Sequence, residues 1–345
     1  MTAETAPVQP ETAPVSDERI SRFVEPLRVK PGAKVRLPQD FDPKAGKHRA
    51  SSAEAKALLG QGIEILSEYQ ARLAAQDTYG LLVVLQAMDA AGKDGTIRHV
   101  MSGVNPQGVS VRSFKMPSAE DLDHDFLWRY QRWVPERGSI GIFNRSHYEE
   151  VLVVRVHPEI LDRQKLPPGG RGRAFWEARY RSINDWEEHL YENGIRVVKL
   201  FLNVSQDEQQ ARFLSRIDEP KKNWKFSAND AKERTYWDKY QEAFAEMLGA
   251  TSKKHAPWFV IPADDKPFAR VAAAAVIANA LIEIDPKYPK VSDEQRAALQ
   301  QVRVELTGKA IDGSADLDAV VAGNGHAPVT NGRDGHHGGK KKRKG

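Results

Sequence analysis

Short apolar runs and longer amphipathic runs alternate along most of this chain of 345 residues. The apolar runs, which predict strands, lie at 80–86, 109–114, 139–143, 196–204 and 258–262. Helical spacing of apolar residues lies between and after them, at 93–102, 118–137, 173–193, 205–216, 228–248 and 266–284. This alternation predicts an α/β fold of three layers, with a five-stranded parallel sheet between helices. Ligands are then expected beyond the carboxyl ends of the strands.

The composition excludes several kinds of site. The chain has no cysteine, which excludes a disulfide scaffold, a thiol nucleophile, a zinc finger and an iron–sulfur site. Its net charge is +4, from 51 Lys and Arg against 47 Asp and Glu, which fits an anionic ligand without requiring one. The most apolar stretch, 271–284, is shorter than the roughly 20 residues that span a membrane, so no membrane contact is expected.

Both ends of the chain predict disordered tails. Residues 1–18 are rich in Pro, Ala, Thr and Glu and lack the pattern of a secretory signal, so a cytoplasmic protein is expected. Residues 308–345 end in a run of four lysines and one arginine at 340–344. Such a run is usually a solvated tail, and tethering to an anionic polymer is the alternative. One folded domain, 19–307, is predicted between the tails.

A Gly-Lys loop follows the first apolar run, in the segment AMDAAGKDGT that begins at Ala87. In phosphate-binding loops of this kind, backbone N–H groups and the start of a helix surround phosphate oxygens. The match to GxxxxGK[ST] is incomplete, because Ala87 replaces the first Gly and Asp94 replaces the magnesium-binding hydroxyl. An ordinary strand-to-helix turn therefore stays open as an alternative. The candidate phosphate contacts are Ala90, Ala91, Gly92, Asp94, Gly95 and Thr96.

Asp89 places a carboxylate inside this loop. At close range a bare carboxylate repels phosphate by roughly a few kcal/mol. A Mg²⁺ ion, or Mn²⁺ as the alternative, between Asp89 and phosphate oxygens would turn this repulsion into attraction. Asp94 could support such an ion from further away, but an acid at a helix N-terminus is favoured by the helix dipole alone, and we prefer that interpretation.

The third apolar run ends in the polar segment that begins at Asn144, NRSHYEE. Asn144 could offer a neutral oxygen to the metal, and Arg145 a bidentate fork to phosphate. His147 could be a ligand or a base, although a single His at a strand end is more often a hydrogen-bonded structural residue. Of the two acids that follow, Glu149 stays ambiguous and Glu150 is the candidate nucleotide contact.

A basic segment follows the fourth apolar run and predicts either a solvated surface or a lid, at about 212–240, that closes over a polyanion. Its position after a strand, at the carboxyl edge of the sheet, favours the lid. The candidate polyanion contacts are Arg212, Arg216, Lys221, Lys222 and Lys225, together with Lys115 after the second run and Arg179 in the aromatic helix.

Four blocks in this order resemble the type 2 polyphosphate kinases: AMDAAGKDGTIRHV, FNRSHYEEVLVVRV, SINDWEEHL and RFLSRIDEPKKNWKFS. The resemblance covers roughly residues 20–290. It implies a P-loop kinase fold similar to thymidylate kinase, with a helical lid, that transfers phosphate between inorganic polyphosphate and nucleotides. It also implies that Asp89 and Lys93 are catalytic, that Arg145 contacts phosphate, and that the lid follows the polyphosphate channel.

The resemblance further implies Mg²⁺ held by Asp89 and Asn144, and the adenine nucleotides AMP, ADP and ATP as substrates, with guanine nucleotides as additional candidates. Asn144 stands where the ADP-specific branch often has Asp, and the motifs are more similar to the branch that accepts AMP and ADP. A homodimer or homotetramer is expected, and a specific nucleic-acid partner is not. Two alternatives stay open: an ATP-dependent nucleoside monophosphate kinase, and a non-catalytic protein that binds polyanions or nucleic acid.

Overall fold

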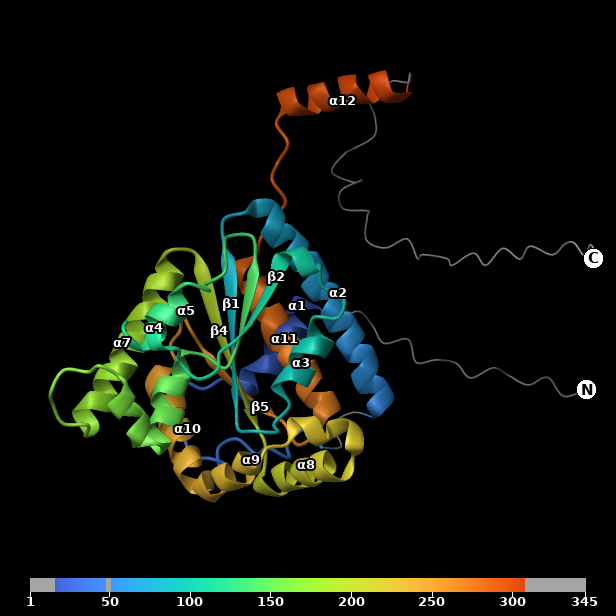
Figure 1. Cartoon of the computed structure of the whole chain (residues 1–345). Coiled ribbons are helices and arrows are strands. Elements are labelled where there is room, and N and C mark those ends of the chain that lie inside the picture. The colour runs from blue at the N-terminus through green and yellow to red at the C-terminus, as the bar shows by residue number, and fades with distance from the viewer. Residues whose placement is uncertain (1–15, 48–50, 308–345) are drawn as a thin grey trace, which may run out of the picture. The chain divides into compact units, whose positions relative to one another are not determined.

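The computed structural model describes residues 16–47 and 51–307 (Figure 1). In this part of the chain one parallel sheet has the strand order β2-β3-β1-β4-β5. The strands are β1 (Gly80–Ala87), β2 (Val109–Ser113), β3 (Ile140–Asn144), β4 (Ile195–Asn203) and β5 (Trp258–Pro262). All five predicted strands are therefore confirmed, and β1 lies in the middle of the sheet.

Helices cover both faces of the sheet and complete the three predicted layers (Figure 1). One layer contains α1 (Asp17–Val24), α2 (Ser52–Gln76), α3 (Lys93–Val100) and α11 (Lys266–Ile284). The other contains α6 (Val153–Val156), α7 (Arg173–Glu192) and α10 (Trp237–Thr251). Two further helices, α8 (Gln206–Asp218) and α9 (Ala228–Glu233), lie below the carboxyl ends of the strands.

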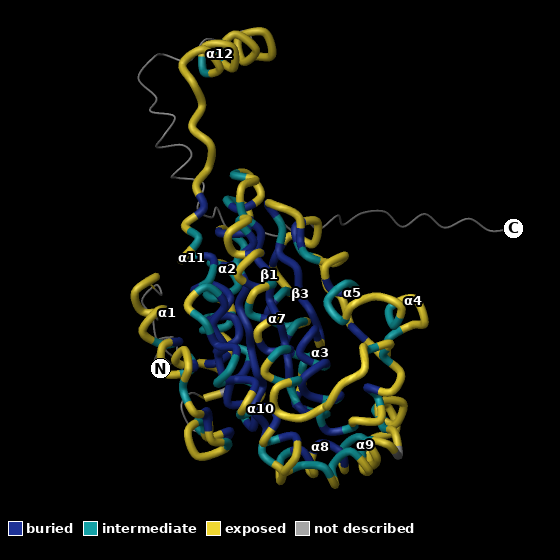
Figure 2. The backbone as a smooth tube through the Cα atoms, turned by 90° about the vertical axis from the view of Figure 1, so that its left-hand side faces the viewer, coloured by how far each residue is buried: buried dark blue, intermediate teal, exposed yellow. Residues whose placement is uncertain are grey.

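The core runs along the sheet, as Figure 2 shows by the buried strands at its centre. All residues of β3 and β5 are buried, and so are nearly all residues of β1 and β4. Strand β2, at one edge, is mostly exposed. Near-continuous apolar sequence is typical of parallel strands that have helices on both faces.

Helix α11 is long and apolar enough to cross a membrane by length and composition alone. The apolar stretch at 271–284 underestimated it, because the helix begins at Lys266 and has 19 residues. Ten of its residues are buried, and it packs against α1, α2, α3 and the sheet. An apolar helix covered on most sides by its own protein is the core helix of this layer.

Two helical predictions differ from the structure. The predicted helix at 118–137 is wrong, because only α4 (Ala119–Leu122) and α5 (Trp128–Gln131) form there. Asp125 accepts a hydrogen bond from the N–H of Leu127, and such a local side-chain bond competes with the helical pattern. The predicted helix at 228–248 is divided between α9 and α10 by a 3-10 turn at Arg234–Tyr236. Of the helices with eight or more residues, α1, α2 and α12 (Asp293–Thr307) were not predicted from the sequence.

The chain divides into two compact units, one ending at Pro289 and one beginning at Lys290. The domain predicted for 19–307 therefore ends earlier in the structure, because α11 stops at the left-handed Asp285 and Pro286 follows it. Helix α12 (Asp293–Thr307) belongs to the second unit. At the other end, α1 already begins at Asp17, within the predicted tail. Residues 1–15 and the basic tail at 308–345 lie outside the described residues.

Candidate active site

The loop between β1 and α3, residues 88–92, turns through two left-handed residues. Gly92, which precedes α3, has φ of 108°, and Ala90 has φ of 61°. Glycine adopts such a value freely, whereas alanine pays about 1–2 kcal/mol for it. The N–H groups at the start of a helix have no acceptor inside that helix. In α3 these belong to Lys93, Asp94 and Gly95, so the backbone has donors available for an anion, and the phosphate contact of this loop stays a prediction.

Thr96 and Arg212 donate hydrogen bonds to backbone carbonyl groups of this loop. The Thr96 N–H donates to Gly92 O at 2.9 Å, and Thr96 is buried. Arg212 Nη1 donates to Ala90 O and Ala91 O at 3.1 and 2.7 Å. Its other nitrogens donate to Ala263 O at 2.5 Å and to the Glu208 carboxylate at 2.8 Å. The donors of Arg212 thus hold the loop in place, and its contact with polyphosphate stays a prediction.

Lys93, the first residue of α3, folds back over the end of β1. Its Nζ donates to Ala87 O at 2.9 Å and to Met88 O at 3.4 Å. Burial, and next the positive charge of Arg145, lower the pKa of Lys93 below its ordinary value. An ammonium group destabilised by a neighbouring cation is prepared to bind an anion, because the anion relieves the repulsion.

Arg145 connects the loops that follow β1 and β3. It has φ of 64°, and its N–H donates to Leu85 O at 3.1 Å, which fixes it beside β1. Its Nη2 lies 3.3 Å from Asp89 Oδ1, and its Nη1 lies 3.8 Å from Glu149 Oε2. Glu149, followed by Asp89, raises the pKa of the Arg145 guanidinium despite its burial. Two carboxylates and two cations therefore meet at the carboxyl edge of the sheet.

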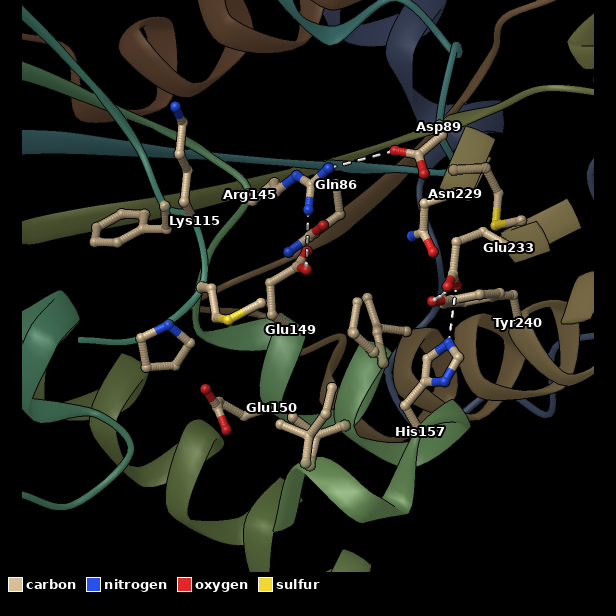
Figure 3. A pocket seen from close by; sticks show the side chains of 18 of the residues that line it. Gln86, Asp89, Lys115, Arg145, Glu149, Glu150, His157, Asn229, Glu233 and Tyr240 are labelled. Carbon is tan, nitrogen blue, oxygen red and sulfur yellow. Dashed lines mark hydrogen bonds and ion pairs between the residues drawn. The ribbon is translucent and has the colours of Figure 1, made fainter. Parts of the chain in front are cut away.

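A cavity of about 520 Å³ opens at this edge (Figure 3). Figure 3 shows Arg145 between Asp89 and Glu149, with Lys115 on one side and Asn229, Glu233 and Tyr240 on the other. The cations that line the cavity are Lys115, Arg129, Arg145, Arg163, Lys232 and Arg234. Apolar side chains such as Phe114, Leu122 and Phe244 complete the wall. This size and mixture of surfaces is typical of a site for a small organic molecule.

Comparison with known proteins decides the family. The sequence model described as Polyphosphate kinase 2 (PPK2) matches residues 49–289. The chain belongs to the polyphosphate kinase 2 family.

Relatives match this member of the polyphosphate kinase 2 family along most of its length. A protein named ADP-polyphosphate phosphotransferase, from Rhodopseudomonas palustris, is 51% identical, covering 81% of this chain and 97% of that protein. A protein named AMP/ADP-polyphosphate phosphotransferase, from Meiothermus ruber, is 42% identical, with coverage of 76% and 94%. The crystal structure of polyphosphate kinase 2 from Arthrobacter aurescens is similar at a TM-score of 0.73 and 40% identity, with coverage of 81% and 96%.

The site of this polyphosphate kinase 2 homologue has donors for a divalent cation, which enzymes of phosphoryl transfer generally need. The Asp89 carboxylate is about one third exposed, and Glu149 lies across Arg145 from it. Among the described residues, no three His, Asp or Glu side chains gather as a complete metal site. One or two carboxylates fit a small hard cation that keeps several waters and binds substrate phosphates.

Asn144, predicted as a metal ligand, uses its amide nitrogen for a different contact. Its Nδ2 donates to Asp94 Oδ1 at 2.6 Å. The preferred interpretation of Asp94, a simple helix N-terminal acid, therefore misses this bond between α3 and β3. The role of the Asn144 side-chain oxygen as a metal ligand stays a prediction.

Glu150 and Arg179, both predicted substrate contacts, pair with each other. Arg179 Nη1 lies 3.2 Å from Glu150 Oε2, both side chains are 4% exposed, and Gln164 bonds to both. Glu150 lines the cavity but lies apart from Arg145 in Figure 3. Glu149 is the acid beside Arg145, and burial raises its pKa despite the opposing effect of Arg145. The adjacent acids in the sequence gave no signal to decide between them.

The predicted lid cations fall into two groups. Lys115 lines the cavity, whereas Arg216, Lys221, Lys222 and Lys225 are not among its lining residues. Lys222 bonds to Ser215 and Glu219, and Arg216 lies 3.4 Å from Asp230. The lid reaches the cavity instead through α9 and α10, from which Glu233 and Tyr240 project. There Glu233 Oε2 lies 2.9 Å from His157 Nε2 and accepts a bond from Tyr240 at 2.9 Å.

Several charged and polar residues of the cavity wall were not predicted from the sequence: Arg129, Arg163, Lys232, Arg234, His157, Glu233 and Tyr240. Lys232 and Glu233 lay inside the predicted lid, so the position of that segment was one available signal. Arg163 and His157 come from irregular chain around a 3-10 turn, Pro158–Arg163, and their spacing carries no pattern.

Proposed function

We propose that this protein transfers a phosphoryl group between inorganic polyphosphate and adenine nucleotides, by the reaction polyP(n) + ADP ⇌ polyP(n−1) + ATP. The observation that carries the proposal is the meeting of Asp89 and Arg145 at 3.3 Å, beside Lys93 and in the wall of the cavity. Membership of the polyphosphate kinase 2 family supports the same reaction. The names of the two relatives above both include ADP, so ADP is the proposed main acceptor.

The bonds broken and formed are both phosphoanhydrides, so the protein needs to position the groups and neutralise charge, without a covalent nucleophile. The α3 N–H groups and Lys93 would bind the oxygens of the transferred phosphoryl group. Arg145 would bind the same group from the side of β3, as a bidentate donor. The cations of the cavity wall would neutralise the remaining phosphates, and Phe114, Leu122 and Phe244 would contact the nucleoside.

Mg²⁺ is the proposed metal, with Mn²⁺ as a substitute. When bound, it would reduce the negative charge of the substrate phosphates. Asp89 and Glu149 are the carboxylates placed to hold it, and the Asn144 oxygen is the proposed additional ligand. Their pairing with Arg145 keeps the carboxylates in place until the substrates arrive.

An assay of donors and acceptors tests the function. Purified protein is incubated with Mg²⁺ and either ADP or AMP, with polyphosphate or ATP as the sole donor, and the nucleotides are separated by chromatography. We expect ATP from polyphosphate and ADP. Phosphorylation of AMP by ATP, with no product from polyphosphate, would instead identify a nucleoside monophosphate kinase. Binding of polyphosphate without any product would identify a non-catalytic binding protein.

Several finer properties are also proposed. AMP is the second acceptor, as the motif at Asn144 suggested, although the relative named for ADP alone shares the higher identity. Guanine nucleotides are tested in the same assay. A homodimer or homotetramer, measured by light scattering, and a cytoplasmic location, measured by cell fractionation, complete the proposal.

A further inference from the structure

A buried ion pair lies beneath the loop that follows β3. Lys199, on β4, and Glu187, on α7, both have side chains with no exposed surface. Lys199 Nζ donates to Glu187 Oε2 at 2.5 Å, to the Tyr148 hydroxyl at 2.9 Å and to Thr251 O at 2.7 Å. All three donors of the ammonium group therefore have acceptors.

The same carboxylate holds two consecutive residues of the loop. Glu187 Oε1 accepts a hydrogen bond from the Tyr148 hydroxyl at 2.8 Å and lies 3.2 Å from His147 Nε2. Both loop side chains are fully buried. Above them, Ser146 Oγ accepts bonds from Gln86 Nε2 at 3.0 Å and from the Tyr148 N–H at 3.2 Å. The middle of the loop is thus fixed by side chains of β1, β4 and α7.

The two ends of this short loop carry the groups that face the cavity. Arg145 precedes the anchored residues and Glu149 follows them, and both line the cavity beside Asp89. No more than two residues separate either one from His147 and Tyr148. The Glu187–Lys199 pair is therefore the anchor of this loop. A shift of the anchor would move both charged groups relative to Lys93 and Asp89.

Stability alone does not explain a charged pair at this place. Removing two charges from water costs several kcal/mol each, and replacing a buried ion pair by apolar residues is often neutral or stabilising. Burial lowers the pKa of Lys199 to about 8, although Glu187 opposes the shift. An apolar pair at these positions would have no acceptor for the hydroxyl of Tyr148 or the ring of His147. The need to bond these two side chains is therefore a reason for the buried charges.

We propose that Glu187 and Lys199 are positioning residues for phosphoryl transfer. Through His147 and Tyr148 they hold Arg145 and Glu149 in the geometry that meets Asp89 and Lys93. Neither residue touches the cavity, so both act through the loop. The inference rests on the proposed function, because it concerns the same site.

Two double variants separate positioning from charge. In Glu187→Gln with Lys199→Met, the ion pair is gone but an amide oxygen remains for His147 and Tyr148. In Glu187→Met with Lys199→Met, that acceptor is lost as well. Urea denaturation measures the folded fraction of each, and steady-state kinetics with polyphosphate and ADP give kcat and KM. We expect the Met/Met variant to have a kcat about 10-fold or more below that of the Gln/Met variant, with KM changed much less.

The same pair of variants is then compared with Arg145→Ala present. If the anchor acts by positioning Arg145 and Glu149, much of the difference in kcat disappears there, because one positioned group is missing. A purely structural role predicts the same ratio in both backgrounds. Equal kcat values for the Gln/Met and Met/Met variants, or a loss that follows the unfolded fraction, would overturn the inference.

Tyr148→Phe is the variant to use if the Met/Met protein does not fold. It removes the hydroxyl that bonds to Glu187 and Lys199 and keeps the buried ring. We expect it to fold and to lose kcat about 3- to 10-fold, and unchanged kcat would count against the inference. An inactive wild-type protein would contradict the proposed function itself, whereas an active wild type with insensitive variants contradicts only the positioning role.

Discussion

The loops after β1 and β3 meet at one edge of the sheet but are held in different ways. The first, residues 88–92, is fixed through its backbone by α8, with Arg212 on the carbonyls of Ala90 and Ala91 and Gln209 on the carbonyl of Asp89. The second, residues 145–150, is fixed through its side chains by buried groups of the core. The first loop is therefore supported by a helix at the edge of the sheet, whereas the second is supported by the sheet and a helix on its face.

This difference has a consequence for the lid. Helix α8 continues into the lid, whose α9 contacts the body through Glu233 and His157. Movement of the lid would therefore be transmitted by α8 to the first loop. The second loop, anchored to β4 and α7, would stay in place and provide a fixed reference for Arg145. The substitutions below test whether the two loops depend on these two supports.

The largest effect is expected from the charged groups of the first loop. Lys93→Ala and Asp89→Asn should each lower kcat by about 10²- to 10³-fold, because they remove charge aimed at the transferred group. The measurement is the initial rate of ATP formation from ADP and polyphosphate. Lys30→Ala is the matched control and should keep full activity, because Lys30 is exposed and is not part of the loops after β1 and β3. Near-normal turnover of the Lys93 variant in a folded protein would contradict the site.

The next effect tests the peripheral support. Arg212→Ala leaves the carbonyls of the first loop without their donors and should cost about 2 kcal/mol in the free energy of unfolding, measured in urea. It should also lower kcat, because the loop loses its fixed shape. Arg212→Lys keeps the charge but has fewer donors in a different geometry. It should therefore restore only part of the free energy of unfolding and only part of kcat. Full activity in the alanine variant would show that the loop holds its shape without α8.

A smaller effect is expected at the second loop from Glu149→Gln. Its activity should fall about 10-fold, because Arg145 loses one of its two acidic partners. Glu150→Gln is the control and should lower the rate less, since Glu150 contacts Arg179 instead.

The same variant predicts a dependence of stability on pH. Burial raises the pKa of Glu149 above its ordinary 4.5, so the folded protein binds this proton more tightly than the unfolded chain does. Ionisation of Glu149 therefore lowers the free energy of unfolding as the pH rises above about 4.5. The glutamine variant should be more stable than the wild type at pH 7, and this gain should disappear below pH 4.5. A gain that does not change with pH would contradict the assignment.

The sequence predicted the sheet and the residues at its carboxyl edge because those signals are local. Each buried strand is one apolar run, and Asp89 and Arg145 follow two such runs directly, so parallel topology alone brings them to the same edge. Asp94 and Asn144 could be placed at that edge too, but their bond at 2.6 Å could not, because it depends on the direction of two side chains.

The functions of the arginines could not be read from the sequence. Arg179 and Arg212 have the charge of a polyanion site, yet both are buried and satisfied by carboxylates or carbonyl groups. Which cation is exposed to the cavity depends on how α7 and α8 pack, and helical spacing does not specify that. The Glu187–Lys199 pair was missed for the same reason, since one residue lies in an aromatic helix and the other in an apolar strand.

The smallest effect is expected from the lysines on the outer side of the lid. Lys221 and Lys225 are exposed and lie outside the cavity wall, whereas Lys115 is part of it. With a short polyphosphate, Lys221→Ala and Lys225→Ala should change the rate by less than about 2-fold, because their charges lie outside the cavity and are screened from its substrate by salt. Lys115→Ala, the matched comparison, should raise KM severalfold. A large loss of rate in either the Lys221 or the Lys225 variant would contradict this expectation. It would indicate that polyphosphate binds over the lid, as the basic sequence of this segment predicted.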